Sequence, residues 1–319
     1  MKAAIVLRAG ESPVYGDFAE PSKVPGDGCI TVSAAAISHV VKSRASGKHY
    51  TATDKFPFIV GIDGVGRRED GKRVYFAMPR APYGSMAERV VVPSAQCFEL
   101  PDDLDDVTAA AIAIPGVSSW AAYKERAHLE VGETVLVNGA TGTAGRLAVQ
   151  IAKHLGAKKV IATGRNAEAL RSVAALGADV TIPIITNVTS FEDSLKEQFV
   201  EGVDVVIDYL WGTSAERLLI TGAKVGREGV PIRFVQIGAM SGAEITLPSA
   251  VLRSTAIELM GSGLGSIHLN RFVRCIEGLL RVTAPSGFKI ATTPVPLSEV
   301  ATAWPRDVSS RRTVFTTGP

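Results

Sequence analysis

The sequence predicts an α/β protein in which a six-stranded, parallel, doubly wound sheet accompanies a second, β-rich domain. Two observations lead to this prediction. In the second half of the chain, short apolar runs alternate with helical patterns, as in a sheet built from βαβ units. The first part instead contains short strands separated by turn residues. The length of 319 residues is typical of two domains.

Six apolar segments predict the strands of the parallel sheet. The fourth segment is continuously apolar apart from Asp204, as expected where helices cover both faces of a sheet. The predicted strands are residues 134–138, 159–163, 178–182, 203–207, 232–237 and 256–261.

The two ends of the chain are expected to form the β-rich domain. Two alanine-rich helical stretches lie around residues 106–126, and we expect Pro115-Gly116 to separate them. Because the six-stranded unit is complete by residue 261, the remaining tail is expected to return to the first domain. The predicted N-terminal strands are residues 2–7, 29–35, 58–65, 74–76 and 86–92, and the predicted domain limits are 1–115, 116–264 and 265–319.

A glycine-rich turn, Gly139 to Gly145, joins the first predicted parallel strand to a helix. The order of strand, glycine turn and helix is typical of a dinucleotide site. The turn presents backbone N–H groups, and the start of the helix carries partial positive charge, so a pyrophosphate fits there.

The second predicted strand ends in Gly164-Arg165-Asn166, and Arg165 lies 20 positions after Gly145. A site for NAD(H) usually has an acidic residue near this position, which binds the ribose 2′-hydroxyl group. A guanidinium group can instead pair with a 2′-phosphate through two hydrogen bonds. These residues therefore favour NADPH as the cofactor. The alternative is a solvated surface arginine beside an unrelated turn.

The composition excludes several other classes of protein. The formal net charge is only +2 and the basic residues are scattered, so no nucleic-acid partner is expected. The uncharged run from Val107 to Tyr123 falls short of a membrane span, and the apolar run at the N-terminus is too short for a signal peptide. No membrane partner is therefore expected. Three separate cysteines, Cys29, Cys97 and Cys275, suit a reduced, cytoplasmic protein.

An ordered set of motifs over nearly the whole chain resembles the zinc-independent quinone oxidoreductase branch of the medium-chain dehydrogenase/reductase superfamily. The resemblance implies a GroES-like catalytic domain, built from both chain ends, and a Rossmann domain. It also implies a homodimer, for which the apolar segment from Ala256 to Met260 is the candidate sheet edge. The motifs are Pro25-Gly26, Gly61-Ile62-Asp63-Gly64-Val65-Gly66, Tyr83-Gly84-Ser85-Met86-Ala87-Glu88, Leu100-Pro101-Asp102, Pro115-Gly116-Val117-Ser118, the turn at 139–145, Phe234-Val235-Gln236-Ile237-Gly238 and Pro296-Leu297-Ser298-Glu299-Val300.

The same resemblance implies the residues that contact the cofactor. Ser118 matches a threonine near the nicotinamide, and Ile237-Gly238 would lie near its ribose. Leu210 follows the fourth strand and would contact the ribose or adenine side. Each of these residues also has a packing explanation, because any doubly wound sheet needs glycine turns and apolar strand ends. The backbone contacts to the pyrophosphate are implied for Thr141, Gly142, Thr143, Ala144 and Gly145.

Two positions that hold zinc ligands in zinc-dependent relatives differ here. Those relatives have a cysteine where this chain has Ser38, and a Gly-His-Glu motif where it has Gly61-Ile62-Asp63. Ile62 cannot bind a metal, and a catalytic zinc needs three protein ligands. We therefore expect no zinc. The alternative is a soft site made by His39 and His49, which are more simply read as surface or hydrogen-bonded histidines.

The segment Ile37–Tyr50 aligns with the active-site segment of the family, in which Ser38 replaces the asparagine and is a candidate catalytic residue at that position. Tyr50 is the first candidate for a hydrogen-bond donor to the substrate, and Lys42 is the second. The alternatives are that Tyr50 is an aromatic residue that only packs and that Lys42 is a solvated lysine.

Together these features predict an NADPH-dependent oxidoreductase that transfers hydride to a small-molecule substrate, a quinone or an α,β-unsaturated carbonyl, without a metal. The alternative is a non-catalytic NADPH-binding protein, a role known for relatives such as zeta-crystallin, because the family's asparagine is missing at Ser38. A zinc-type alcohol dehydrogenase is disfavoured by Ile62.

Overall fold

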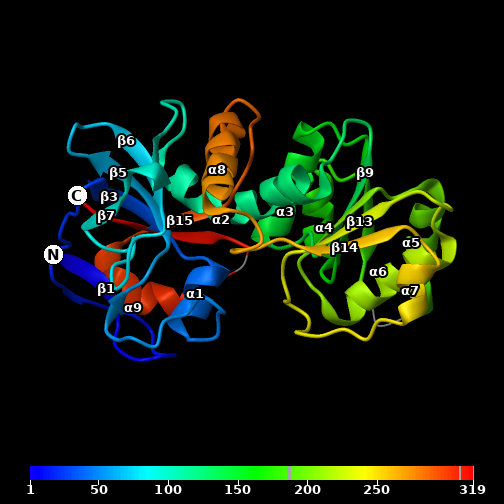
Figure 1. Ribbon diagram of the computed structural model, residues 1–319, viewed down its shortest axis with the longest axis horizontal. Coiled ribbons are helices and arrows are strands. Elements are labelled where there is room, and N and C mark those ends of the chain that lie inside the picture. The colour runs from blue at the N-terminus through cyan, green and yellow to red at the C-terminus, as the bar shows by residue number, and fades with distance from the viewer. Residues whose placement is uncertain (185–187, 309, 319) are drawn as a thin grey trace. The chain divides into compact units, whose positions relative to one another are not determined.

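The computed structural model describes residues 1–184, 188–308 and 310–318. The chain forms two compact units, one made of Met1–Pro115 with Val273–Pro319 and the other of Gly116–Phe272 (Figure 1). The divisions fall between Pro115 and Gly116 and between Phe272 and Val273.

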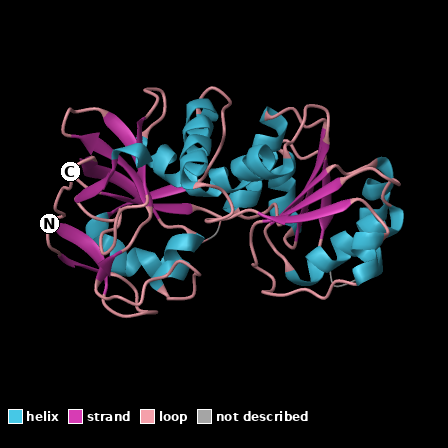
Figure 2. Cartoon of the chain, in the orientation of Figure 1, coloured by secondary structure: helices cyan, strands magenta, loops and turns pink. Residues whose placement is uncertain are grey.

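The unit formed by Gly116–Phe272 contains the predicted parallel sheet, and the α/β fold class is confirmed (Figure 2). The strand order is β11-β10-β9-β12-β13-β14, and every neighbouring pair is parallel. This is the strand order of a Rossmann fold. The strands are β9 (Thr134–Asn138), β10 (Lys159–Gly164), β11 (Val180–Pro183), β12 (Val205–Asp208), β13 (Ile232–Gln236) and β14 (Ile257–Gly261).

Helices cover both faces of this sheet, which explains the continuous apolar strands. Helices α3 (Thr143–His154) and α4 (Ala167–Ala174) lie on one side. Helices α5 (Val188–Glu201), α6 (Gly212–Val225) and α7 (Ser249–Arg253) lie on the other side (Figure 1). The core on the second side gathers strand and helix residues, among them Leu136, Ile161, Val206, Phe234, Phe191, Phe199 and Leu218.

The other unit contains two sheets. In the larger one, strand β16 pairs antiparallel with β3, and Val314 lies opposite Ala36. The C-terminal tail therefore completes a sheet begun near the N-terminus. The smaller sheet has the order β2-β1-β4, and the larger has the order β15-β16-β3-β5-β6-β8, with β7 also paired to β3. The strands are β1 (Lys2–Val6), β2 (Val14–Asp17), β3 (Asp27–Ala36), β4 (Phe58–Ile59), β5 (Asp63–Arg68), β6 (Arg73–Ala77), β7 (Arg89–Pro93), β8 (Cys97–Glu99), β15 (Thr292–Pro296) and β16 (Arg312–Thr316).

Two strand predictions in this unit were wrong in detail. The apolar segment 58–65 is two strands, β4 and β5, because Gly61 between them has a φ of +102°. The predicted strand from Met86 begins only at Arg89. Met86 instead makes its backbone hydrogen bonds with the backbones of Val60 and Ala4, at 3.0 and 2.8 Å.

The prediction that Pro115-Gly116 separates two helices was also wrong. Helix α2 (Asp106–Ala121) runs through Pro115 and continues as a π-helical segment, Ala122–Ala127. Proline inside a helix costs about 3 kcal/mol, because its ring removes one hydrogen bond. Burial of the alanine-rich helix offsets this cost, since Ala111, Ala113 and Val117 are almost fully buried.

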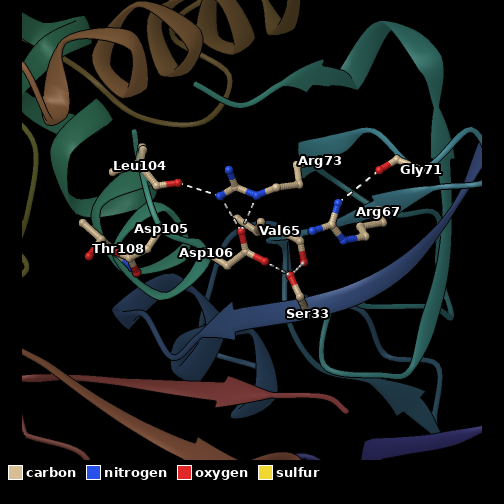
Figure 3. Close-up of polar contacts among 9 residues, drawn as sticks. All are labelled: Ser33, Val65, Arg67, Gly71, Arg73, Leu104, Asp105, Asp106 and Thr108. Carbon is tan, nitrogen blue, oxygen red and sulfur yellow. Dashed lines mark hydrogen bonds and ion pairs between the residues drawn. The ribbon is translucent and has the colours of Figure 1, made fainter. Parts of the chain in front are cut away.

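Polar contacts hold the start of α2 against the sheet of its own unit (Figure 3). The Asp105 carboxylate accepts a hydrogen bond from the Thr108 N–H at 2.8 Å and so caps the helix. The Asp106 carboxylate accepts from the Arg73 guanidinium at 2.7 Å and from the Ser33 hydroxyl at 2.6 Å. The first turn is therefore anchored to β6 and β3.

The other helices of this unit are short, apart from α8 (Leu269–Thr283), which begins before the division at residue 272. No helix in the described part of the chain combines the length and the apolar character needed to cross a membrane. The remaining elements are α1 (His39–Ala45), α9 (Val300–Ala303) and the 3₁₀ turns Ser94–Gln96, Leu297–Glu299 and Trp304–Arg306.

Candidate functional site

The candidate cofactor site lies at the carboxyl edge of the parallel sheet, where β9 and β12 are neighbours. Helix α3 leads from β9 to β10, whereas α6 leads from β12 to β13 on the other side. The two connections therefore diverge at this point of the sheet. Doubly wound α/β proteins bind ligands at such a switch point.

The glycine turn after β9 is held tightly by the protein itself. Gly139 has a φ of +89°, and both Gly139 N and Ala140 N donate to the Thr163 carbonyl oxygen, at 3.2 and 2.8 Å. A Cβ atom on Gly145 would lie 2.3 Å from the Gly139 carbonyl oxygen. Glycine at position 145 is therefore required for α3 to pack against the turn.

Gly142 is different, because no contact among the described residues explains why it is glycine. It precedes α3 with an ordinary φ of −76°, and apart from its chain neighbours no described atom lies within 4 Å of the place where a Cβ would be. No side chain caps α3 at this position. The space above Gly142 and the positive end of α3 together fit a phosphate group that approaches the backbone closely.

A buried polar cluster links the ends of three strands below the turn. The Asn138 side-chain amide donates to the Asp208 carboxylate at 2.7 Å and to the Ser214 hydroxyl at 3.0 Å. The Asn138 side-chain carbonyl accepts from the Thr163 hydroxyl at 2.6 Å. Asn138, Thr163 and Asp208 thus connect β9, β10 and β12, which fixes the relative positions of the loops that follow these strands.

Asp208 also shapes two of these loops. Its carboxylate accepts from Leu210 N at 3.0 Å and from Trp211 N at 3.1 Å. Its main-chain carbonyl accepts from the N–H groups of Ile237 and Gly238, at 2.8 and 3.1 Å. Burial raises the pKa of Asp208 to about 6, while the hydrogen bonds that it accepts oppose the rise.

Asn138 and Asp208 are not among the cofactor residues predicted from the sequence. The signal was present, because each is a polar residue that ends an apolar parallel strand. Side chains at that edge of a sheet meet one another.

The end of β10 and the loop that follows it contain the residues predicted to bind the 2′-phosphate of the cofactor. Gly164 must be small, because a Cβ there would lie 2.5 Å from the Thr141 methyl group. The Asn166 side chain caps α4 by accepting from Ala169 N at 2.9 Å. Arg165 is exposed and makes no hydrogen bond or ion pair with any described residue. Its guanidinium is therefore available to a ligand.

The remaining predicted cofactor residues lie on the same unit. The Ser118 hydroxyl is 3.1 Å from the Tyr209 hydroxyl, and burial raises the pKa of Tyr209 to about 12. Leu210 packs over Gly139, where an added Cβ would lie 2.9 Å from the leucine side chain. The structure thus gathers the turn at 139–145 with Gly164, Leu210 and Gly238 around the ends of neighbouring strands.

The candidate substrate residues, in the other unit, have three different surroundings. Ser38 is buried and caps α1, since its hydroxyl oxygen accepts from Val41 N at 3.1 Å. The Lys42 ammonium forms an ion pair with Asp307 at 2.9 Å. Tyr50 is 71% exposed and stacks on His49, with ring centres 4.2 Å apart. Their roles in chemistry stay predictions.

Comparison with known proteins identifies the family. The chain is 32% identical to the probable NADPH-dependent quinone reductase tdiC of Emericella nidulans, over 95% of this chain and 96% of that protein. The chain belongs to the quinone oxidoreductase branch of the medium-chain dehydrogenase/reductase superfamily. Mouse prostaglandin reductase-3 is 27% identical over 83% of this chain and 71% of its own length.

A solved quinone oxidoreductase has the same fold. The enzyme from Thermus thermophilus, whose structure is also known in complex with NADPH, superposes with a TM-score of 0.81. It is 26% identical and covers 99% of this chain and 100% of its own. A family model described as a zinc-binding dehydrogenase matches residues 144–279. That match does not include Ser38 or Ile62. These are the two positions at which this chain differs from its zinc-dependent relatives.

The described residues contain no group of three or more His, Cys, Asp or Glu side chains that could hold a metal ion. Ser38 and Ile62 therefore do not lie beside such a group. Ile62 is almost fully buried in an apolar cluster with Val41 and Met86. Next to it, the Asp63 carboxylate accepts from the Tyr75 hydroxyl at 2.9 Å. Burial raises the pKa of Asp63 to about 7, although the Tyr75 hydrogen bond and the charge of Arg312 oppose the rise.

The raised pKa of Asp63 predicts how stability depends on pH. Below its folded pKa, Asp63 is protonated in the folded protein at pH values where the unfolded chain is ionised. Stability should therefore fall as pH rises from about 4 to 7. We expect Asp63→Asn, which can still accept the Tyr75 hydrogen bond, to remove about 2 kcal/mol of this fall between pH 5 and pH 8.

The measurement is the difference between the thermal unfolding curves of the wild type and Asp63→Asn at several pH values. The difference removes the contribution of other groups that titrate in this range, such as Asp208. Parallel pH profiles for the two proteins would contradict the assignment.

Proposed function

We propose that this protein is an NADPH-dependent reductase that transfers hydride to a quinone or an α,β-unsaturated carbonyl without a metal. The observation that carries the proposal is the open space above Gly142 at the start of α3, at the switch point of the sheet. The described residues leave the space beside Gly142 open, and the positive end of α3 would attract a phosphate group there.

The choice of NADPH rests on Arg165. This exposed guanidinium follows β10, where a carboxylate would be expected in a protein that binds NADH. The names of the Emericella and Thermus relatives support the same cofactor. Thr141, Gly142, Thr143, Ala144 and Gly145 would bind the pyrophosphate, and Arg165 the 2′-phosphate, with Gly164 and Asn166 setting the course of its loop.

Bound NADPH supplies a hydride, which with one proton reduces a quinone to a hydroquinone or a conjugated carbon–carbon double bond to a single bond. The chain's own task is to orient the cofactor and to stabilise negative charge on the acceptor oxygen. Asp208 positions Leu210, Ile237 and Gly238 for the first task. Tyr50 and Lys42 remain the proposed donors for the second.

The proposal excludes a catalytic zinc because of the residues present. Ile62 offers only hydrocarbon, and the Ser38 hydroxyl already accepts the hydrogen bond that caps α1. Quinones and enones accept hydride at carbon, so their reduction needs hydrogen-bond donors and no Lewis acid. A homodimer through β14, an edge strand of the six-stranded sheet, and a cytoplasmic location stay predictions.

The test is oxidation of NADPH by the purified protein, with NADH in parallel, against a panel of quinones and enones. We expect saturable turnover with NADPH and little with NADH. A stoichiometric zinc ion in the active protein would overturn the metal-free mechanism. Binding of NADPH without turnover of any acceptor would favour the non-catalytic alternative, in which Ser38 marks the loss of the family's active-site asparagine.

A further inference from the structure

A small pocket in the N-terminal unit contains one charged side chain, Arg44. Arg44 and Val41 are three positions apart on α1, so both face the pocket. The walls are otherwise apolar or uncharged. Apart from these two residues, the pocket is lined mainly by Phe58, Gly61, Ile62, Pro79, Pro82 and Tyr83.

Arg44 is half-buried and has no partner among the described residues. Its guanidinium makes no hydrogen bond or ion pair there, and burial alone lowers its pKa. The guanidinium nevertheless stays charged at neutral pH, as arginine does throughout proteins. A charge removed from water without a partner is unfavourable, so this site is incomplete without an acceptor.

Other half-buried arginines in the described part of the chain have a carboxylate or a main-chain carbonyl oxygen as acceptor. Arg73 pairs with Asp106 at 2.7 Å, and Arg217 pairs with Glu192 at 3.0 Å. Lys42, on the same helix as Arg44, pairs with Asp307. Among the half-buried arginines that the structure describes, Arg44 therefore differs in that its guanidinium has no acceptor.

The residues beside Arg44 do not supply negative charge. Burial first, and the charge of nearby Arg44 second, lower the pKa of His49, which favours its neutral form. The neutral ring adds no second positive charge and stacks on Tyr50. Arg44 is thus the one charged side chain among the described residues that line this pocket.

We propose that Arg44 binds a carboxylate of the acceptor, so that the preferred substrates are quinones or enones that carry a carboxylate on an apolar chain. The planar guanidinium can hold both carboxylate oxygens, and the apolar walls can hold the chain. The proposal rests on the proposed reductase function and names its substrate class. The hydride and the proton go to the conjugated bond as before, and the carboxylate is unchanged.

The test compares two acceptors that differ in one charge, (E)-7-oxooct-5-enoate and its methyl ester. Three methylene groups insulate the enone from the carboxylate, so the reactivity of the double bond is the same in both. We expect the wild type to favour the acid in kcat/KM by about 10- to 100-fold, the usual range for a hydrogen-bonded charge pair. Arg44→Met should remove most of that preference, and Arg44→Lys should retain part of it.

Arg281→Met is the matched control, because Arg281 is an exposed arginine of the same unit whose side chain is 64% accessible. It removes the same charge from the protein and should keep the acid preference. No preference in the wild type, or a preference that survives Arg44→Met, would overturn the proposal while turnover itself still supported the reductase function.

A second measurement tests the carboxylate site at Arg44 independently of the proposed reductase activity. Titration calorimetry with the saturated acid 7-oxooctanoate and its methyl ester needs no turnover. If no acceptor is reduced but the acid binds more tightly than the ester in the wild type and not in Arg44→Met, the carboxylate site stands and the reductase function fails. Equal binding of the acid and the ester by the wild type would overturn the carboxylate site.

Discussion

Replacing Gly145 with alanine should raise the dissociation constant for NADPH at least tenfold and destabilise the Rossmann unit. The new methyl group would lie 2.3 Å from the Gly139 carbonyl oxygen and 2.6 Å from the Ala140 Cα atom. Both atoms belong to the backbone, so α3 or the turn must shift. Such overpacking costs about 1–3 kcal/mol, even though alanine favours helices more than glycine does. Thermal unfolding and fluorescence titration with NADPH measure the two effects.

Gly142→Ala is the matched variant for this experiment. It adds the same methyl group three positions earlier, where no described atom outside the neighbouring residues lies within 4 Å and the φ of −76° suits any residue. Its unfolding midpoint should stay near that of the wild type, while its affinity for NADPH falls about tenfold. Wild-type affinity in Gly142→Ala would mean that the turn does not hold the pyrophosphate.

Replacing Arg165 with aspartate should lower the preference for NADPH over NADH by at least about 100-fold. The substitution removes a guanidinium that can pair with the 2′-phosphate, and it introduces a carboxylate that repels the same group. Arg165→Ala removes only the attraction, so it should weaken NADPH binding by about 10- to 100-fold with little effect on NADH. Dissociation constants for both cofactors give the preference directly.

Arg171→Ala provides the control for charge. Arg171 is also exposed, and it lies on α4, the helix that follows the Arg165 loop. Neutralising it should reduce NADPH affinity far less than neutralising Arg165. An equal loss in the two alanine variants would indicate general electrostatic attraction and not a specific contact with the phosphate.

The parallel sheet could be predicted from the sequence because its signal is local. Strand β9 has the bounds expected from its apolar run, and the other five strands lie within about two residues of theirs, since the turn residues between runs mark their limits. The glycine turn was equally readable. Its strand, turn and helix are consecutive in the chain.

The parts that could not be predicted depend on distant residues. Pro115 stays inside a helix because burial of the surrounding alanines outweighs its local effect. Lys42 meets Asp307, which lies at the other end of the chain. Arg44 stands out only once the pocket is known, because its missing partner is a property of the surroundings and not of the segment that contains it.

The pairing of β16 with β3 has a consequence for how the protein is made. Ribosomes release the N-terminal strands first, and residues 116–272 are all synthesised before β15 and β16 emerge. Until then, the edge of β3 that β16 will cover has no strand beside it. Unpaired strand edges attract other chains. The sheet that contains β3 is therefore begun before residues 116–272 are made and completed after them, and premature termination would leave this sheet open to aggregation.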